Sequence, residues 1–143
     1  LNQGDEKEYI GIIYKDDKTK EVYVWLCNDE KNEDLNTNTN KTGVKKLLFL
    51  DLVKKYDGVV AYCKINVDID NKDIMKKIKQ YAKFKFMNIK GLLGKPNINR
   101  GISSCKFISN VLQDIGFSVK KSIISHPLAM VGNNYNAPEI VVK

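Results

Sequence analysis

Residues 101–117, GISSCKFISNVLQDIGF, contain the segment that most restricts the fold, because they predict a helix with one apolar side. Ser103 or Ser104 is a typical N-cap, and Gly116 is typical of the position just after a helix ends. Apolar side chains recur at helical spacing: Phe107, Ile108, Val111, Leu112 and Ile115. Such a helix must bury its apolar side, so the rest of the chain has to supply a surface for it.

Strand-like runs supply that surface. Residues 8–16 (EYIGIIYKD) and 21–27 (EVYVWLC) flank a polar turn and predict a β-hairpin. Residues 58–68 and the closing residues 139–143 are also rich in β-branched side chains. We therefore expect an α+β fold in which these four runs form one antiparallel sheet that packs against the helix at 103–115.

Three further segments complete the expected single domain over residues 1–143. Residues 71–84 predict an amphipathic helix with lysines on its outer side, which we expect to cover the other side or the end of the sheet. Residues 28–42, NDEKNEDLNTNTNKT, are polar throughout and predict a flexible surface loop. Residues 43–58 predict a strand or turn followed by a short helix that stops at Gly58.

The positive charge of the chain, and the residue type that carries it, bear on whether the chain binds nucleic acid or a membrane. The net charge is +7, and Arg100 is the only Arg, so lysine carries almost all of the positive charge. Proteins that read nucleic-acid sequence favour Arg, because a guanidinium makes paired hydrogen bonds to guanine or phosphate. We therefore expect no specific nucleic-acid partner. The lysine side of residues 71–84 is either a solvated surface or a peripheral contact with an acidic membrane.

The number and spacing of the cysteines and the histidine are not those of a disulfide-rich protein or a zinc protein. Cys27, Cys63 and Cys105 are odd in number and far apart, and His126 is the only His. This pattern lacks the spacing of a disulfide framework or a zinc site, so we expect no metal, no cofactor and a reducing, cytoplasmic compartment. No apolar run reaches the roughly 18–20 residues that cross a bilayer, and we expect no secretory leader.

Cys105 is the residue best placed for chemistry. At the start of a helix it would lie beside backbone N–H groups that have no partner within the helix, at the positive end of the helix dipole. Both features stabilise a thiolate and lower the pKa of the thiol. Cys27 and Cys63 lie in strand-like runs, where burial favours the neutral thiol. Free Cys is also among the residues most often buried, so Cys105 is either a reactive thiol or a core residue.

The segment SSCKFISNVLQDIGF resembles the nucleophile segment of NlpC-type papain-like cysteine hydrolases. Its strands lie before it, which resembles the circularly permuted branch that includes lecithin–retinol acyltransferase-like proteins and a family encoded by poxviruses and other large DNA viruses. EYIGIIY followed by EVYVWLCND is similar to the first hairpin of that branch. The resemblance implies a permuted papain-like fold, a viral origin, and Cys105 as the nucleophile toward an amide or ester bond of a peptide or lipid substrate.

One position departs from the pattern of this branch. Tyr9 stands where the branch carries its catalytic His, and tyrosine, with a pKa near 10, is a poor base at neutral pH. His126 is the other candidate base, and it either folds back toward Cys105 or is a simple loop residue. Asn28 and Asp29, at the end of the second strand, are the candidates for the group that orients the base.

Three functions are compatible with these residues. In the first, the chain is a cysteine peptidase, amidase or thiol acyltransferase with Cys105 as nucleophile and His126 or Tyr9 as base. In the second, it keeps the fold without the chemistry and acts as a binding module. In the third, which rests on net charge alone, it binds nucleic acid electrostatically. The first two differ in whether a proton acceptor lies within about 4 Å of the Cys105 sulfur, and we expect Cys105 and Tyr9 to be close in space.

Overall fold

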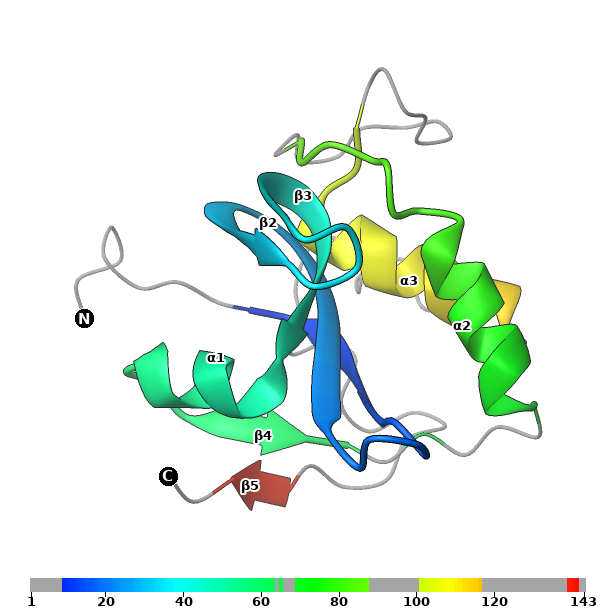
Figure 1. The fold of residues 1–143 in the computed structure, drawn as a ribbon. Helices are drawn as coiled ribbons and strands as arrows, with labels where there is room; N and C mark the ends of the chain where they lie inside the picture. The colour runs from blue at the N-terminus through cyan, green and yellow to red at the C-terminus, as the bar shows by residue number, and fades with distance from the viewer. Residues whose placement is uncertain (1–8, 64, 66–68, 88–100, 117–138, 142–143) are drawn as a thin grey trace.

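The computed structural model describes residues 9–63, 65, 69–87, 101–116 and 139–141. These residues form an α+β fold of two antiparallel sheets and three helices (Figure 1), which confirms the expected fold class. In chain order the elements are β1 (Gly11–Lys15), β2 (Val22–Asp34), β3 (Thr39–Leu48), α1 (Phe49–Lys55), β4 (Val60–Tyr62), α2 (Asn71–Lys79), α3 (Ser104–Asp114) and β5 (Glu139–Val141).

The central sheet has the strand order β1-β2-β3 and is antiparallel throughout. β1 pairs with β2 from Gly11, opposite Leu26, to Lys15, opposite Val22. The turn between them is closed by Asp16, whose carboxylate accepts hydrogen bonds from the backbone N–H groups of residues 18 and 19. This pairing confirms the hairpin predicted from residues 8–16 and 21–27.

Residues 28–42 are not the flexible surface loop that their polarity predicts. They form the far ends of β2 and β3, where residues 32–34 pair with residues 39–41. The prediction was wrong because it counted apolar residues, whereas this hairpin is held by a backbone ladder and by one buried acid. Composition alone does not show either of these.

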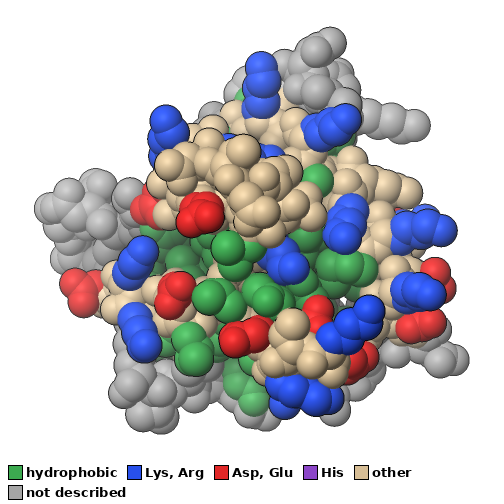
Figure 2. All heavy atoms as spheres, viewed as in Figure 1, with side chains coloured by type: hydrophobic (Ala, Val, Ile, Leu, Met, Phe, Trp, Pro, Cys, Tyr) green, Lys and Arg blue, Asp and Glu red, His purple; other side chains and the backbone are tan. Residues whose placement is uncertain are grey.

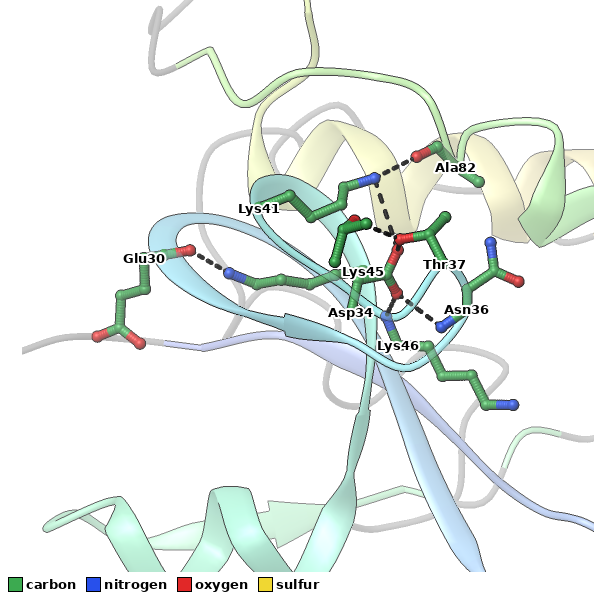
Figure 3. Close-up of polar contacts among 9 residues, drawn as sticks. Glu30, Asp34, Asn36, Thr37, Lys41, Lys45, Lys46 and Ala82 are labelled. Atoms are coloured by element: carbon green, nitrogen blue, oxygen red, sulfur yellow. Dashed lines mark hydrogen bonds and ion pairs between the residues drawn. The ribbon is translucent and has the colours of Figure 1, made fainter.

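The buried acid is Asp34, which is fully inaccessible to solvent. Its carboxylate accepts hydrogen bonds from the backbone N–H of Asn36 at 3.0 Å and of Lys46 at 2.9 Å, and from the hydroxyl of Thr37 at 3.0 Å (Figure 3). The Lys41 ammonium lies 3.7 Å from the same carboxylate. A buried charge with this many partners stabilises the turn that joins β2 to β3.

α1 follows β3 directly and confirms the short helix predicted within residues 43–58. It packs against β2 and β3 and buries Val53. The helix ends at Lys55, with Tyr56 as its C-cap, and so stops before Gly58, the predicted end.

The runs at 58–68 and 139–143 do not join the central sheet, contrary to the expected four-run sheet. β4 pairs with β5 instead, with Val60 opposite Val141 and Tyr62 opposite Glu139, in a second, two-stranded sheet. Figure 1 shows this sheet beside α1.

Figure 1 shows α2 and α3 together on one side of the central strands, with α1 on the other side. The core lies between the central sheet and these two helices, and its buried residues are Trp25, Cys27, Val44, Ile78, Ile102, Phe107, Ile108, Val111 and Leu112. α2 therefore does not lie on the opposite side from α3, which was one of the two positions expected for residues 71–84, the other being the end of the sheet. Ile78 lies in the same core as α3, and the Tyr81 hydroxyl, just after α2, donates a 2.7 Å hydrogen bond to Asp114. In the described part of the chain, no helix has the length and apolar character needed to cross a membrane.

Candidate functional site

Cys105 is the second residue of α3, as its sequence position predicts. Ser103 is the N-cap, and its hydroxyl accepts a 3.2 Å hydrogen bond from the backbone N–H of Lys106. The Cys105 side chain is buried, with 9% of its surface exposed. It therefore lies in the first turn of a capped helix, where the helix dipole favours a thiolate and burial opposes it.

Two hydrogen bonds attach the start of α3 to β2. The Ser104 hydroxyl donates to the backbone carbonyl of Cys27 at 2.6 Å, and the Cys27 thiol donates to the backbone carbonyl of Ile102 at 3.4 Å. Cys27 is almost fully buried, and burial raises the pKa of its thiol to about 12. Cys27 is therefore a neutral, structural thiol, and of these two cysteines Cys105 is the one placed for reaction.

Residues 84–87 fix the segment that leads into α3. The backbone N–H of Val44 in β3 donates to the carbonyl of Phe84 at 3.2 Å, and the N–H of Ile102 donates to the carbonyl of Lys85 at 2.8 Å. The crossing is close because Gly43 has no side chain: a Cβ there would lie 2.5 Å from the Phe84 carbonyl oxygen. Backbone contacts thus place the first turn of α3 against the sheet.

Tyr9 lies just before β1, and its hydroxyl donates a 2.5 Å hydrogen bond to the carboxylate of Glu30. Its ring packs edge-on against Tyr56, with ring centroids 5.3 Å apart. Burial and the hydrogen bond to Glu30 raise the pKa of Tyr9 above its ordinary value. Tyr9 is therefore a neutral hydrogen-bond donor at neutral pH, which makes it a still weaker base than an exposed tyrosine.

Tyr9 packs against the C-terminal end of α1. Ile10, next to Tyr9 in the chain, packs against the core that α3 covers. Adjacent side chains of an extended chain point to opposite sides, and Tyr9 contacts Tyr56, the C-cap of α1. The proximity of Tyr9 and Cys105 stays a prediction.

Glu30 is the residue that sequence reasoning missed. Asn28 and Asp29 were the candidates for orienting a base at Tyr9, but the carboxylate that holds the Tyr9 hydroxyl belongs to Glu30. Strand alternation does not identify Glu30, because the pairing of β2 with β3 is irregular between Asn28 and Asn32. An acidic residue close after the predicted strand end was the only available signal.

A buried lysine on the neighbouring strand contacts this irregular stretch, and no sequence pattern singles it out. Lys45 of β3 is fully inaccessible, and its ammonium donates to the backbone carbonyl of Glu30. Figure 3 shows the Lys45 side chain reaching that carbonyl while the Glu30 carboxylate points away from it. Burial lowers the pKa of Lys45 to about 8, although the nearby Glu30 carboxylate acts in the opposite direction. Lys45 therefore holds the bulge of β2, the irregular stretch between Asn28 and Asn32, through the Glu30 carbonyl.

His126, the other candidate base, lies outside the described residues. Within the described ranges, no group of three or more His, Cys, Asp and Glu side chains has the arrangement of a metal site. The chain matches no protein-family model, no curated protein and no solved structure.

Proposed function

We propose that the chain is a cysteine hydrolase or acyl-transfer enzyme with a permuted papain-like fold, in which Cys105 is the nucleophile. The observation that carries this proposal is the place of Cys105 in the first turn of a capped helix that is hydrogen-bonded to a central antiparallel strand. The order of the elements, with the hairpin sheet before the cysteine helix, adds support. Both features are similar to those of the permuted branch.

In the proposed reaction, the Cys105 thiolate adds to the carbonyl carbon of an amide or ester. The C–N or C–O bond then breaks, the amine or alcohol leaves with a proton, and the acyl group stays on Cys105 as a thioester. Water or an acceptor nucleophile attacks the thioester and restores the thiol. Backbone N–H groups at the start of α3, which have no acceptor inside the helix, would stabilise the negative charge on the carbonyl oxygen.

His126 is the proposed base of this reaction. Tyr9 suits the role poorly, because its hydroxyl already donates to Glu30 and its pKa is raised. A neutral phenol does not hold a thiolate in the way that an imidazole does. If His126 has this role, its removal slows the formation of the acyl-enzyme without changing the fold.

A second function has support of its own. The burial of Cys105 and the hydrogen bond that occupies Tyr9 are both features expected of a binding module that has lost its chemistry. The contact surface would be the outer side of α2, where Lys72, Lys76 and Lys79 are exposed and could meet an acidic membrane. Figure 2 shows lysine side chains over this part of the molecule, with acidic side chains among them.

Acylation by an activated ester separates the two functions. The full chain is incubated with p-nitrophenyl acetate, and acetylation of each cysteine is followed by peptide mass spectrometry. The enzyme proposal expects Cys105 to be acetylated faster than Cys63, and this rate to fall in His126→Ala. Acetylation of Cys105 no faster than that of Cys63 would favour the binding module. Cys105→Ser serves as the blank.

A further inference from the structure

The first turn of α3 contains Cys105, so whatever holds this turn in place also acts on the proposed nucleophile. The terminal turns of helices open more easily than the middle, because their outermost backbone groups have no partner within the helix. The stabilisation that the helix dipole gives to a negative charge falls off within that same turn. A first turn that opened often would therefore give the Cys105 thiolate little of this stabilisation.

Two hydrogen bonds close the start of α3 onto its own cap. The Ser103 hydroxyl accepts from the backbone N–H of Lys106 at 3.2 Å, and the Ser103 carbonyl accepts from the backbone N–H of Phe107 at 3.0 Å. Both bonds run between residues of the helix and its N-cap. They hold the helical shape of the first turn, but they do not attach the turn to the sheet.

The Ser104 hydroxyl makes that attachment, through its 2.6 Å hydrogen bond to the Cys27 carbonyl. Cys27 lies one residue beyond Leu26, which pairs with Gly11 at the end of the β1–β2 ladder. Cys27 is only 1% exposed, so water does not replace the hydroxyl when it is removed. Loss of the hydroxyl therefore leaves a buried carbonyl without this donor, which costs more than the loss of an exposed hydrogen bond.

The residue before the cap has attachments of its own. Ile102 bonds to the segment 85–87 through its N–H at 2.8 Å and its carbonyl at 3.0 Å, and the Cys27 thiol also donates to that carbonyl. These bonds fix the chain where it enters the helix, on the other side of the cap from Cys105. Ser104 lies on the helix side of the cap and is next to Cys105 in the chain. Its hydrogen bond therefore acts directly on the turn that carries the thiol.

We propose that Ser104 is a positioning residue for Cys105: its hydrogen bond to the Cys27 carbonyl keeps the first turn of α3 closed against β2 and so keeps the Cys105 thiolate stabilised. The inference rests on the proposed function in taking Cys105 as the nucleophile. It adds the residue that keeps this nucleophile in its reactive form. Ser104 itself takes no part in the bonds that form and break.

The test measures alkylation of Cys105 by iodoacetamide between about pH 5 and 11, residue by residue, in the full chain and in Ser104→Ala. Each profile gives two quantities: the rate at high pH, which reports how accessible the thiol is, and the midpoint, which reports how stable the thiolate is. In Ser104→Ala the first turn opens more often, which exposes Cys105 and raises the rate at high pH. The same opening weakens the effect of the helix dipole, so the midpoint should rise by about half a pH unit.

Two further variants separate positioning from a general effect on the fold. Ser104→Thr keeps a hydroxyl and should restore the wild-type midpoint. Ser109→Ala removes a hydroxyl that donates to the Lys106 carbonyl within α3, and it should leave the midpoint unchanged. If Ser104→Ala is partly unfolded, all the profiles are measured in sucrose, which favours the folded state.

Three results would overturn the proposal, even where the alkylation rate or the stability changes. They are a midpoint in Ser104→Ala equal to that of wild type, an equal rise in Ser109→Ala, and a midpoint in Ser104→Thr as high as that in Ser104→Ala. Each of them would make the Ser104 hydrogen bond a contribution to the fold alone.

The same profiles distinguish this inference from the proposed function. The wild-type midpoint decides the proposed function, whereas the difference between Ser104→Ala and wild type decides the role of Ser104. A wild-type midpoint above about 9 that rises further in Ser104→Ala would refute the enzyme and leave the role of Ser104 standing. A wild-type midpoint well below about 8 that does not rise in Ser104→Ala would do the reverse.

Discussion

The Ser104 hydroxyl donates a 2.6 Å hydrogen bond to the backbone carbonyl of Cys27, across 77 positions of sequence. This bond joins the first turn of α3 to β2 and so places Cys105, the next residue, relative to the central sheet. The Cys27 thiol returns a hydrogen bond to the carbonyl of Ile102, just before the helix. These two hydrogen bonds hold the start of α3 against β2.

Ser104→Ala removes one of these bonds and leaves the Cys27 carbonyl without its donor. We expect the free energy of unfolding to fall by about 1–2 kcal/mol, measured by urea denaturation. Ser109→Ala is the matched control, because the Ser109 hydroxyl donates to the Lys106 carbonyl within α3 and, among the described residues, makes no hydrogen bond to the sheet. A loss in Ser104→Ala no larger than in Ser109→Ala would contradict this role of Ser104.

Asp34→Ala tests the correction made for residues 28–42. The change removes the acceptor of two backbone N–H groups and of the Thr37 hydroxyl. We therefore expect the free energy of unfolding, measured by urea denaturation, to fall by about 3 kcal/mol or more. Glu33→Ala, at the exposed neighbouring position of β2, should change stability by less than about 0.5 kcal/mol. Similar losses in the two variants would mean that the hairpin does not depend on its buried acid.

Gly43→Ala tests the close crossing of residues 84–87 over β3. Gly43 has φ of +89°, and a Cβ there would lie 2.5 Å from the Phe84 carbonyl oxygen. Gly116 has a similar φ of +102° with nothing within 4 Å of the added carbon. Backbone strain alone should lower the free energy of unfolding by about 1 kcal/mol in Gly116→Ala. In Gly43→Ala the clash should lower it by about 2 kcal/mol or more in addition. Equal losses by thermal or urea denaturation would contradict the crossing.

Lys45 gives the fold a specific dependence on pH. Burial lowers its pKa from 10.5 to about 8, so between these values the unfolded chain binds more protons than the folded one. Stability from this group therefore rises with pH across that window, by up to about 3 kcal/mol. Lys45→Met lacks this titration. The difference in unfolding free energy between wild type and Lys45→Met should rise in favour of wild type from pH 8 to 10, and a constant difference would contradict the burial of the charge.

The parts of the fold that repeat an apolar pattern were predictable from the sequence. The cap at Ser103 and the apolar spacing after it predicted α3, and the runs on either side of Asp16 predicted the first hairpin. The parts that depend on a single contact were not predictable. The burial of Asp34 orders a polar segment, and β4 pairs with β5 instead of joining the central sheet.

The candidate site divides in the same way. The position of Cys105 follows from its helix and was predictable. Glu30 lies within the irregular pairing between Asn28 and Asn32, and Lys45 reaches the Glu30 carbonyl from β3, which no local pattern indicates. A bulge changes which side chains meet, and no local pattern in a polar run reveals it. The sequence therefore indicated the candidate nucleophile but not the polar groups on the strands beside it.

The most direct test of the account is the rate at which iodoacetamide alkylates Cys105 between pH 5 and 10, measured residue by residue with Cys105→Ser as the blank. Cys27 is the internal control, since burial raises its pKa to about 12 and it should stay unlabelled. The account predicts an apparent pKa for Cys105 well below about 8, and a higher value in His126→Ala. Labelling that is slow at every pH, or that rises only above about pH 9, would contradict a nucleophile at Cys105 and leave a binding module.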